Sequence, residues 1–219
     1  MQSDVSRLLR ETAENLRAIS ESDYSASVEQ ALKVLEEAFR AGRSLFAFGN
    51  GGSSADAQHL CAELVGRFLI ERRALPAVAL TTNQALLTAW SNDYQFDDIF
   101  ARQIEGLGRA GDVAWGISTS GNSANVVNGL RRARETGLRT IGLTGSGGGR
   151  MAEHCDVLMA VPLQQTPRIQ EVHLVTFHAI CGALEQRQRR VCAAPRSFAR
   201  IDGGRWRRRT GSGEEKRSL

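Results

Sequence analysis

Two side chains able to do chemistry, His59 and Glu63, stand four residues apart in the stretch "FAFGNGGSSADAQHLCAELVGRF", residues 46–68. In a helix, residues at positions i and i+4 share one face, so the imidazole and the carboxylate would be neighbours. Such a pair could bind a metal ion or serve as a catalytic acid and base. By spacing alone, a hydrogen bond on a helix surface is the simpler interpretation. Arg67, four residues further on, extends the same polar stripe.

A second group of candidates lies in the last helix-like segment: Gln170, Glu171, His173 and His178. Their spacing does not choose among them. Gln170 and His178 are eight residues apart, which is about 12 Å along a helix and about 80° around its axis. A ligand shared by these two would need both side chains to reach toward it, or one of them to come from another subunit.

Two loops have the composition of an anion site, "GNGGSS" at 49–54 and "STSGNS" at 118–123. Glycines let a backbone approach an anion closely, the following helix offers unpaired N–H groups, and hydroxyls add donors. Tight turns with serine caps are the simpler alternative for either loop. The loops lack the lysine of a Walker A motif and the GxGxxG spacing of dinucleotide folds, which argues against a nucleotide. A third glycine cluster, "GSGGGR" at 145–150, is interpreted as a flexible turn.

These loops join short apolar runs to helix-like segments. The apolar runs, expected to be strands, are 44–48, 76–80, 112–117, 139–144 and 156–161. The helix-like segments are 4–20, 26–41, 54–68, 84–91, 97–107, 123–136 and 168–187. Strands that alternate with helices predict a parallel sheet covered on both faces, with both anion loops beyond the carboxyl ends of strands. The fold class is therefore α/β, a sandwich with a helical hairpin in front.

Length and charge divide the chain in two. We expect one domain over residues 1–190, followed by a basic and poorly ordered tail over 191–219. From Arg187 onward eleven Lys and Arg stand against three Asp and Glu, so the first 186 residues hold 17 basic and 21 acidic side chains. The basic character thus belongs to the tail, where "RWRRR" has a composition that can bind nucleic acid nonspecifically; a solvated end without a partner is the simpler interpretation.

Compartment is predicted from apolar runs and cysteines. No apolar run approaches the roughly 18 residues needed to span a bilayer, and the N-terminal residues do not resemble a signal peptide. The cysteines show no CxxC pair or framework spacing, which favours reduced and mostly buried thiols: Cys61, Cys155, Cys181 and Cys192. We therefore expect a cytoplasmic protein without membrane contact.

Taken in order, five motifs resemble the SIS (sugar isomerase) family and, within it, the phosphoheptose isomerases. They are "GNGGSSADAQHLCAELVGRF", "LTTNQALLTAWSNDYQFDDIFARQIEGLG", "ISTSGNS", "IGLTGSGGG" and "RIQEVH", and the resemblance runs from about residue 5 to residue 187. It implies an SIS-type three-layer sandwich with a parallel five-stranded sheet and an N-terminal helical hairpin.

The resemblance also implies the roles of individual residues. Glu63 and His178 fall at the catalytic positions, as base and acid. The implied substrate-binding residues are Asn50, Gly51, Gly52, Ser53, Glu63, Arg67, Asn92, Asp93, Ser118, Thr119, Ser120, Ser123 and Gln170. The implied ligands of one zinc ion per subunit are His59, Glu63, Gln170 and His178. This makes Glu171 and His173 the less favoured members of the last helix. Pro167 stands where relatives commonly have Ala or Asp, and suits a helix start.

The activity implied by the resemblance is conversion of D-sedoheptulose 7-phosphate to D-glycero-D-manno-heptose 7-phosphate through an enediol, the first step toward nucleotide-activated heptose. Members form homotetramers with shared active sites.

Two other classes of protein remain as alternatives. A non-catalytic SIS adaptor that binds a replication initiator protein need not keep His59 and Glu63, which are present here. A sugar-phosphate-sensing regulator would carry a DNA-binding module, and the tail is too short and unpatterned for a recognised one.

Overall fold

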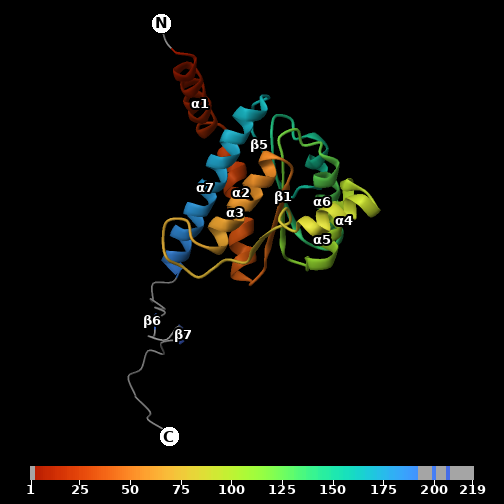
Figure 1. Ribbon diagram of the computed structural model, residues 1–219. Coiled ribbons are helices and arrows are strands. Elements are labelled where there is room, and N and C mark those ends of the chain that lie inside the picture. Colours follow the sequence, from red (N-terminus) through yellow and green to blue (C-terminus); the bar gives the residue numbers. More distant parts are fainter. Residues whose placement is uncertain (1–2, 192–198, 201–205, 208–219) are drawn as a thin grey trace, which may run out of the picture. The chain divides into compact units, whose positions relative to one another are not determined.

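The computed structural model describes residues 3–191, 199–200 and 206–207, with side chains through residue 187. Its centre is a five-stranded sheet in the order β2-β1-β3-β4-β5, with every neighbouring pair parallel (Figure 1). The strands are β1 (Leu45–Gly49), β2 (Ala77–Ala79), β3 (Val113–Ser118), β4 (Arg139–Thr144) and β5 (Val157–Ala160). The predicted five-stranded parallel sheet is confirmed.

Helices connect the strands. They are α1 (Asp4–Ser20), α2 (Tyr24–Arg40), α3 (Gly52–Val65), α4 (Gln84–Asp93), α5 (Ile99–Leu107), α6 (Ala124–Glu135) and α7 (Thr166–Val191), with 3-10 turns η1 (Phe96–Asp98) and η2 (Gly149–His154). α1 and α2 form the predicted N-terminal pair. α7 begins two residues earlier than expected and takes Pro167 into its first turn, where the missing N–H costs no helical hydrogen bond.

The strands bury both faces because successive side chains point to opposite sides of the sheet. On β1, Leu45 and Ala47 join a core cluster with residues of α2, α3 and α7. Phe46 and Phe48 of the same strand join a second cluster with residues of α5 and α6. The part of the chain through Glu185 is thus a three-layer sandwich, with α2, α3 and α7 on one face of the sheet and α5 and α6 on the other (Figure 1).

The strand register places the two anion loops at one edge of the sheet. Gly49, the last residue of β1, pairs with Ile117 of β3, and Ser118 pairs with Thr144 at the end of β4. The loops that follow β1 and β3 therefore leave the sheet side by side. This confirms the expectation that both lie beyond the carboxyl ends of neighbouring strands.

One helix is shorter than predicted. The segment 54–68 was expected to be helical throughout, but α3 ends at Val65 and Gly66 is its C-terminal cap. Arg67 therefore does not extend the helical stripe of His59 and Glu63, and its guanidinium instead pairs with Glu71 at 3.0 Å. The cause lies in Arg72, which binds the carbonyl groups at the end of α3.

The described residues divide after Glu185 into two units, and the second begins at Gln186. In the second unit, β6 (Ala199–Arg200) pairs antiparallel with β7 (Trp206–Arg207). The expectation of a poorly ordered tail over 191–219 otherwise falls outside the described residues. In the part of the chain that the structure describes, no helix combines the length and apolar character needed to cross a bilayer.

Cys61 and Cys181 are buried thiols, as expected, and Cys155 is half-buried. Burial raises the pKa of each of these three thiols to about 12, so they are poor nucleophiles. Cys192 lies outside the described residues.

Candidate active site

Three polar side chains from two helices meet on the surface of the α3–α7 layer. His59 Nε2 lies 3.1 Å from Glu63 Oε1 on α3, and His178 Nε2 of α7 lies 3.4 Å from His59 Nε2. One ligand atom from each of the three residues lies within 4.8 Å of the others. The i,i+4 pair on α3 is thus joined by a histidine that is distant in sequence, which spacing alone did not reveal.

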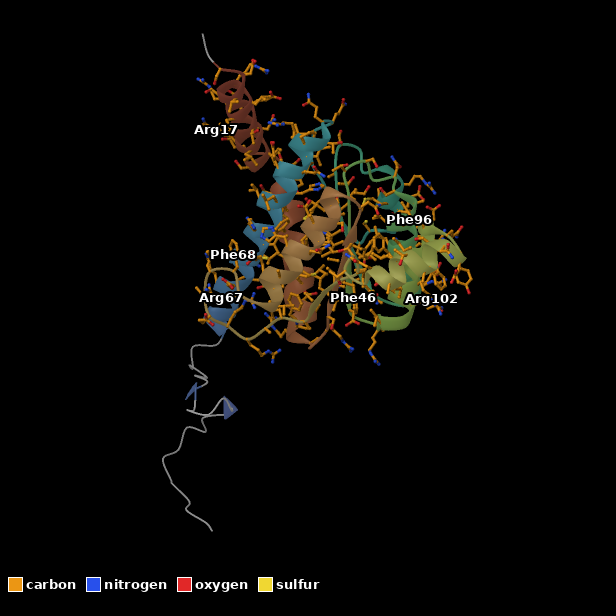
Figure 2. All side chains as sticks on the ribbon, viewed as in Figure 1. Arg17, Phe46, Arg67, Phe68, Phe96 and Arg102 are labelled. Atoms are coloured by element: carbon orange, nitrogen blue, oxygen red, sulfur yellow. The ribbon has the colours of Figure 1, made fainter. Side chains whose placement is uncertain are left out.

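Aromatic rings hold the two imidazoles. Phe177 contacts the His59 ring edge-on, with centroids 5.2 Å apart, and Phe68 lies tilted over the His178 ring at the same distance. Figure 2 shows Phe68 and Arg67 beside α7. Sequence reasoning missed both phenylalanines, because an apolar residue beside a polar one is indistinguishable from ordinary core.

The electrostatics favour a neutral imidazole at His178. Burial lowers its pKa, the neighbouring His59 lowers it further, and Glu63 opposes both effects. A metal ion binds imidazole in its neutral form, so this direction suits a ligand. Asp56, one turn before His59 on α3, has its pKa raised to about 6 by burial, with His59 acting in the opposite direction.

The donor set fits a zinc ion. Two imidazole nitrogens and one carboxylate oxygen are the ligands that zinc takes at catalytic sites, where a fourth position stays available to water or substrate. All three donors lie close enough to share one ion without a change of fold. His59, Glu63 and His178 are therefore the residues that could hold the metal.

The other candidates in the last helix lie elsewhere. Gln170 packs its amide against Gly52, at the start of α3, where a Cβ would collide with it. Glu171 accepts a hydrogen bond from Thr12 of α1 at 3.0 Å. His173 is fully buried, and its Nε2 lies 3.3 Å from the carbonyl oxygen of Thr144. Gln170 thus stands beside the first loop rather than beside the two histidines, and its place among the zinc ligands stays a prediction.

The first loop, 49–54, is shaped by its backbone and by an amide pair. Gly51 caps α3 at φ +55, a conformation that favours glycine, and accepts a hydrogen bond from Ser54 N at 3.0 Å. Asn50 and Asn125 exchange two hydrogen bonds of 2.8 and 2.9 Å between their amides. Asn125 is 2% exposed and lies in the first turn of α6, so it ties the first loop to the second. Sequence reasoning missed it, although it lies only two residues after the motif at 118–123.

The second loop, 118–123, carries a cluster of hydroxyls. Ser118 Oγ lies 3.0 Å from Ser123 Oγ and 3.5 Å from Ser120 Oγ. Ser123 is the N-cap of α6, yet within the described residues its side chain makes no capping hydrogen bond. The missing cap bond at Ser123 does not fit a serine-capped helix start, although Ser120 Oγ accepts from Asn122 N at 3.2 Å as in a serine turn. The hydroxyls lie at a helix N-terminus, an arrangement that suits an anion.

The third glycine cluster, 145–150, was interpreted as a flexible turn, and in the structure it packs against the second loop. Gly121 of the second loop approaches the backbone of Gly148 so closely that a Cβ on Gly121 would collide with its carbonyl oxygen. Met151 N donates to Gly121 O at 2.9 Å, and Arg150 N donates to Asn122 Oδ1 at 3.0 Å. The cluster thus lies behind the hydroxyl loop and hydrogen-bonds to it.

Asn92 and Asp93 lie at the exposed end of α4, where Asn92 Nδ2 donates to Asp93 Oδ1 at 2.8 Å. Among the described residues, no hydrogen bond joins either one to the anion loops. Phe96, three residues after Asp93, lies on the side of the molecule away from Phe68 (Figure 2). The structure of one chain thus does not bring this predicted pair to the histidine cluster.

The sandwich and its loops define the class: the chain belongs to the SIS domain family, whose model matches residues 8–145. Within it, the similarity is to phosphoheptose isomerases. That of Rhodospirillum rubrum is 53% identical over 163 residues, 74% of this chain and 87% of that protein. That of Bradyrhizobium sp. (strain BTAi1) is 51% identical over 180 residues, which are 82% of this chain and 91% of that protein. The solved phosphoheptose isomerase from Neisseria gonorrhoeae is 42% identical, with a TM-score of 0.76, over 84% of this chain and all of that one.

Proposed function

We propose that this protein is a ketose–aldose isomerase that converts D-sedoheptulose 7-phosphate to D-glycero-D-manno-heptose 7-phosphate, the first step toward nucleotide-activated heptose. The observation that carries the proposal is the His59–Glu63–His178 cluster on the helices that carry the first loop and Gln170. The relatives named phosphoheptose isomerase support it, because their similarity extends over most of both chains.

The reaction moves one proton between carbons and one between oxygens. Glu63 takes a proton from C1 of the open-chain ketose, which gives an enediol, and returns a proton to C2. His178, as a neutral imidazole, is proposed to give its ring N–H proton to the oxygen at C2 and to take back the proton that the C1 hydroxyl loses as it becomes the aldehyde. General acid–base catalysis of this kind contributes roughly 10²- to 10⁴-fold to the rate.

Zinc is the proposed cofactor, one ion per subunit, with His59, Glu63 and His178 as ligands and Gln170 as the predicted fourth. A bound zinc ion would act as a Lewis acid that polarises the oxygens of the substrate. Glu63 is proposed both as ligand and as base, and so would exchange between these roles during the reaction.

The second loop is the proposed phosphate site. The hydroxyls of Ser118, Ser120 and Ser123 converge at the start of α6, and Thr119 lies between them. Asn50, Gly51, Gly52 and Ser53 of the first loop would bind hydroxyls along the sugar, together with Gln170. Arg67 is retained as a predicted contact, although it pairs with Glu71 in the described structure.

A homotetramer with shared active sites is the proposed assembly. Asn92 and Asp93 are exposed at the end of α4, where they are available to the site of a neighbouring subunit. Apolar side chains are exposed beside them, at Tyr94 and Phe96, and on α1, at Val5 and Leu9. Contiguous exposed apolar patches mark surfaces that another chain covers, and these side chains would contribute to such patches in the proposed assembly. The cytoplasm is the proposed compartment, on the sequence argument given above.

A substrate panel tests the proposed function. Purified protein with Zn²⁺ is incubated with sedoheptulose 7-phosphate, fructose 6-phosphate and arabinose 5-phosphate, and the formation of new sugar phosphates is measured. We expect turnover of the seven-carbon ketose above the other two, its loss on chelation and its return with Zn²⁺. Binding of sugar phosphate without turnover by zinc-loaded protein would favour the non-catalytic adaptor instead.

A further inference from the structure

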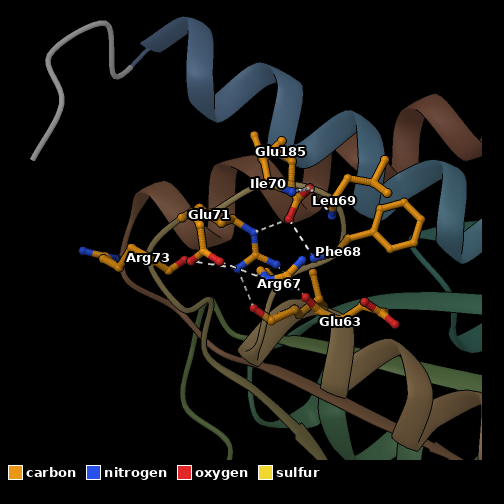
Figure 3. Close-up of polar contacts among 10 residues, drawn as sticks. Glu63, Arg67, Phe68, Leu69, Ile70, Glu71, Arg73 and Glu185 are labelled. Atoms are coloured by element: carbon orange, nitrogen blue, oxygen red, sulfur yellow. Dashed lines mark hydrogen bonds and ion pairs between the residues drawn. The ribbon is translucent and has the colours of Figure 1, made fainter. Parts of the chain in front are cut away.

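Glu185 and Arg72 form a buried ion pair between α7 and the segment that follows α3 (Figure 3). The two side chains are 2% and 7% exposed, and Arg72 Nε lies 3.0 Å from Glu185 Oε1. Charges at this depth are costly unless their remaining donors and acceptors are satisfied. Both groups find those partners in the backbone around the end of α3.

The carboxylate of Glu185 accepts hydrogen bonds from the backbone N–H groups of three successive residues. Oε1 accepts from Phe68 N at 2.8 Å, and Oε2 accepts from Leu69 N at 2.8 Å and from Ile70 N at 3.1 Å. Burial alone would raise the pKa of Glu185, but these three donors and the Arg72 guanidinium hold it below its ordinary value. The chain after α3 is thus wrapped around one carboxylate.

Arg72 holds the last turn of α3 from the other side. Its guanidinium donates to Glu63 O at 2.6 Å and to Leu64 O at 2.8 Å. These are carbonyl groups that the end of a helix leaves without a helical partner, at the negative end of the helix dipole. Glu63 gives its backbone carbonyl to Arg72 while its carboxylate extends away from the ion pair (Figure 3).

The ion pair acts on the two helices that carry the histidine cluster. Glu185 lies seven residues after His178 on α7, which is about two turns along nearly the same face. Phe68, whose N–H is bound by Glu185, lays its ring over the imidazole of His178. One ion pair therefore contacts the backbone of Glu63, the backbone of the residue whose ring covers His178, and both α7 and the segment after α3.

We propose that Glu185 and Arg72 are positioning residues, which hold Glu63 and His178 in the geometry needed for proton transfer and zinc binding. The proposal rests on the proposed function. Both residues act through the backbone and the Phe68 ring, without contact to the sugar. Displacing a catalytic group by about 1 Å can cost roughly 100-fold in rate. Loss of the Glu185–Arg72 ion pair should therefore have a measurable effect on the rate even though neither residue touches the sugar.

Glu185→Gln is the test variant. Each carboxylate oxygen accepts two hydrogen bonds. In the variant, the amide NH₂ that replaces one oxygen is itself a donor, so it cannot accept the two hydrogen bonds at that place. We expect kcat for sedoheptulose 7-phosphate to fall roughly 10- to 100-fold, with KM changed less than about twofold because the phosphate loop is untouched. The affinity of the metal-free protein for Zn²⁺, measured by chelator competition, should fall about 10-fold or more, as for a lost ligand-orienting partner.

Asp112→Asn is the matched control. Asp112 is also a buried carboxylate, and it accepts from Ser44 N and Arg109 N, each at 2.9 Å, in the loops that lead into β1 and β3. Both variants should lower the thermal unfolding midpoint. Only Glu185→Gln should lower kcat and Zn²⁺ affinity. If Glu185→Gln does not fold, Arg72→Lys is used in its place. Lysine keeps the positive charge but lacks the planar guanidinium that donates to both Glu63 O and Glu185.

Equal kcat and equal Zn²⁺ affinity in Glu185→Gln and Asp112→Asn would overturn the proposal, and so would wild-type values in a folded Arg72→Lys protein. Failure of the proposed function looks different. The wild-type protein would then leave sedoheptulose 7-phosphate unchanged, and the Zn²⁺ affinities of the variants would still decide whether the ion pair positions the cluster.

Discussion

At the scale of the residue, Glu63 meets two demands with one carboxylate. Its side chain lies 3.1 Å from His59 Nε2, close enough to bind a shared ion, and it is the proposed base of the isomerisation. A carboxylate held tightly by a cation is a weak base, so catalysis needs the contact to loosen when the sugar binds. The backbone beneath it, held by Arg72, can stay fixed while the carboxylate moves.

Replacement of Glu63 by Gln keeps the size of the side chain and removes the base. We expect a folded protein that still binds sugar phosphate and has a kcat at least about 100-fold lower, the low end for loss of a general base. Glu105→Gln, at an exposed carboxylate on α5, is the control and should behave as wild type. Steady-state rates within a few-fold of each other for the two variants would remove Glu63 from the mechanism.

His173 makes stability depend on pH. Burial lowers its pKa from 6.5 to about 4, although the hydrogen bond to Thr144 O acts the other way. The folded state therefore holds a neutral imidazole while the unfolded state takes up a proton below pH 6.5. This contribution to stability is fully present above pH 6.5 and is lost as the pH falls toward 4, by roughly 3 kcal/mol at about 1.4 kcal/mol per pKa unit.

His173→Gln tests this assignment, because the Gln amide can still donate to Thr144 O but does not titrate. Urea unfolding at several pH values should show a steeper loss of stability between pH 6.5 and 4.5 for wild type than for the variant. Parallel curves for the two proteins would mean that another group causes the acid sensitivity.

At the scale of the element, the hydroxyl loop depends on the glycine cluster behind it. Gly121 has a φ of +67, and a Cβ there would collide with the carbonyl oxygen of Gly148. Gly147 has a φ of +82, but among the described residues no atom lies within 4 Å of a Cβ placed on it. A substitution at Gly147 therefore introduces backbone strain alone, whereas one at Gly121 introduces backbone strain and a steric clash.

Gly147→Ala should cost only about 1–2 kcal/mol of backbone strain and leave the kinetic constants near wild type. Gly121→Ala adds a clash with a backbone carbonyl, so the loop must move away from η2. We expect KM for the sugar phosphate to rise at least about tenfold, since a phosphate contact acts in both ground and transition states. Similar kinetic constants for the two variants would show that the packing of 145–150 on the loop is irrelevant to binding.

The sequence predicted elements well where one physical cause dominated. Buried strands show as short continuous apolar runs, and 139–144 matches β4 at both ends. The end of α3 was predicted too late, because Arg72 captures its carbonyl groups from outside the local pattern. The support given by residues 145–150 was missed for a similar reason: the contact between Gly121 and Gly148 joins segments that no local period connects.

The candidate site was predictable only in part. The spacing of His59 and Glu63 indicates a shared helix face, and the structure confirms that they meet. The addition of His178 came from the family resemblance, since helix geometry does not say which face of α7 meets α3. The amide of Asn125 was missed because its role depends on Asn50, 75 residues away.

At the scale of the whole molecule, charge separates the first 186 residues from the rest. Those residues hold 17 basic and 21 acidic side chains, while eleven basic residues lie from Arg187 onward, beyond every residue of the proposed site. The proposed phosphate site, built from hydroxyls and a helix N-terminus, therefore does not draw on this excess of positive charge.

Truncation after Arg190 tests this separation. We expect the isomerase constants and the oligomeric state, measured by light scattering, to stay as in the full chain. Any weak and salt-sensitive binding of nucleic acid should disappear with the arginines. Loss of most of the activity, or a change of oligomeric mass, would show that residues 191–219 belong to the working enzyme and that the boundary at residue 190 is misplaced.

The proposed reaction interconverts a seven-carbon ketose phosphate and its aldose by proton transfer through an enediol. NMR of sedoheptulose 7-phosphate incubated with zinc-loaded protein in D₂O tests it most directly. The account predicts signals of the aldose heptose 7-phosphate, with deuterium at C2 because the base exchanges its proton with solvent before returning it. Folded, zinc-loaded protein that leaves the ketose signals unchanged, or an aldose that forms without any deuterium at C2 in repeated turnovers, would contradict the account.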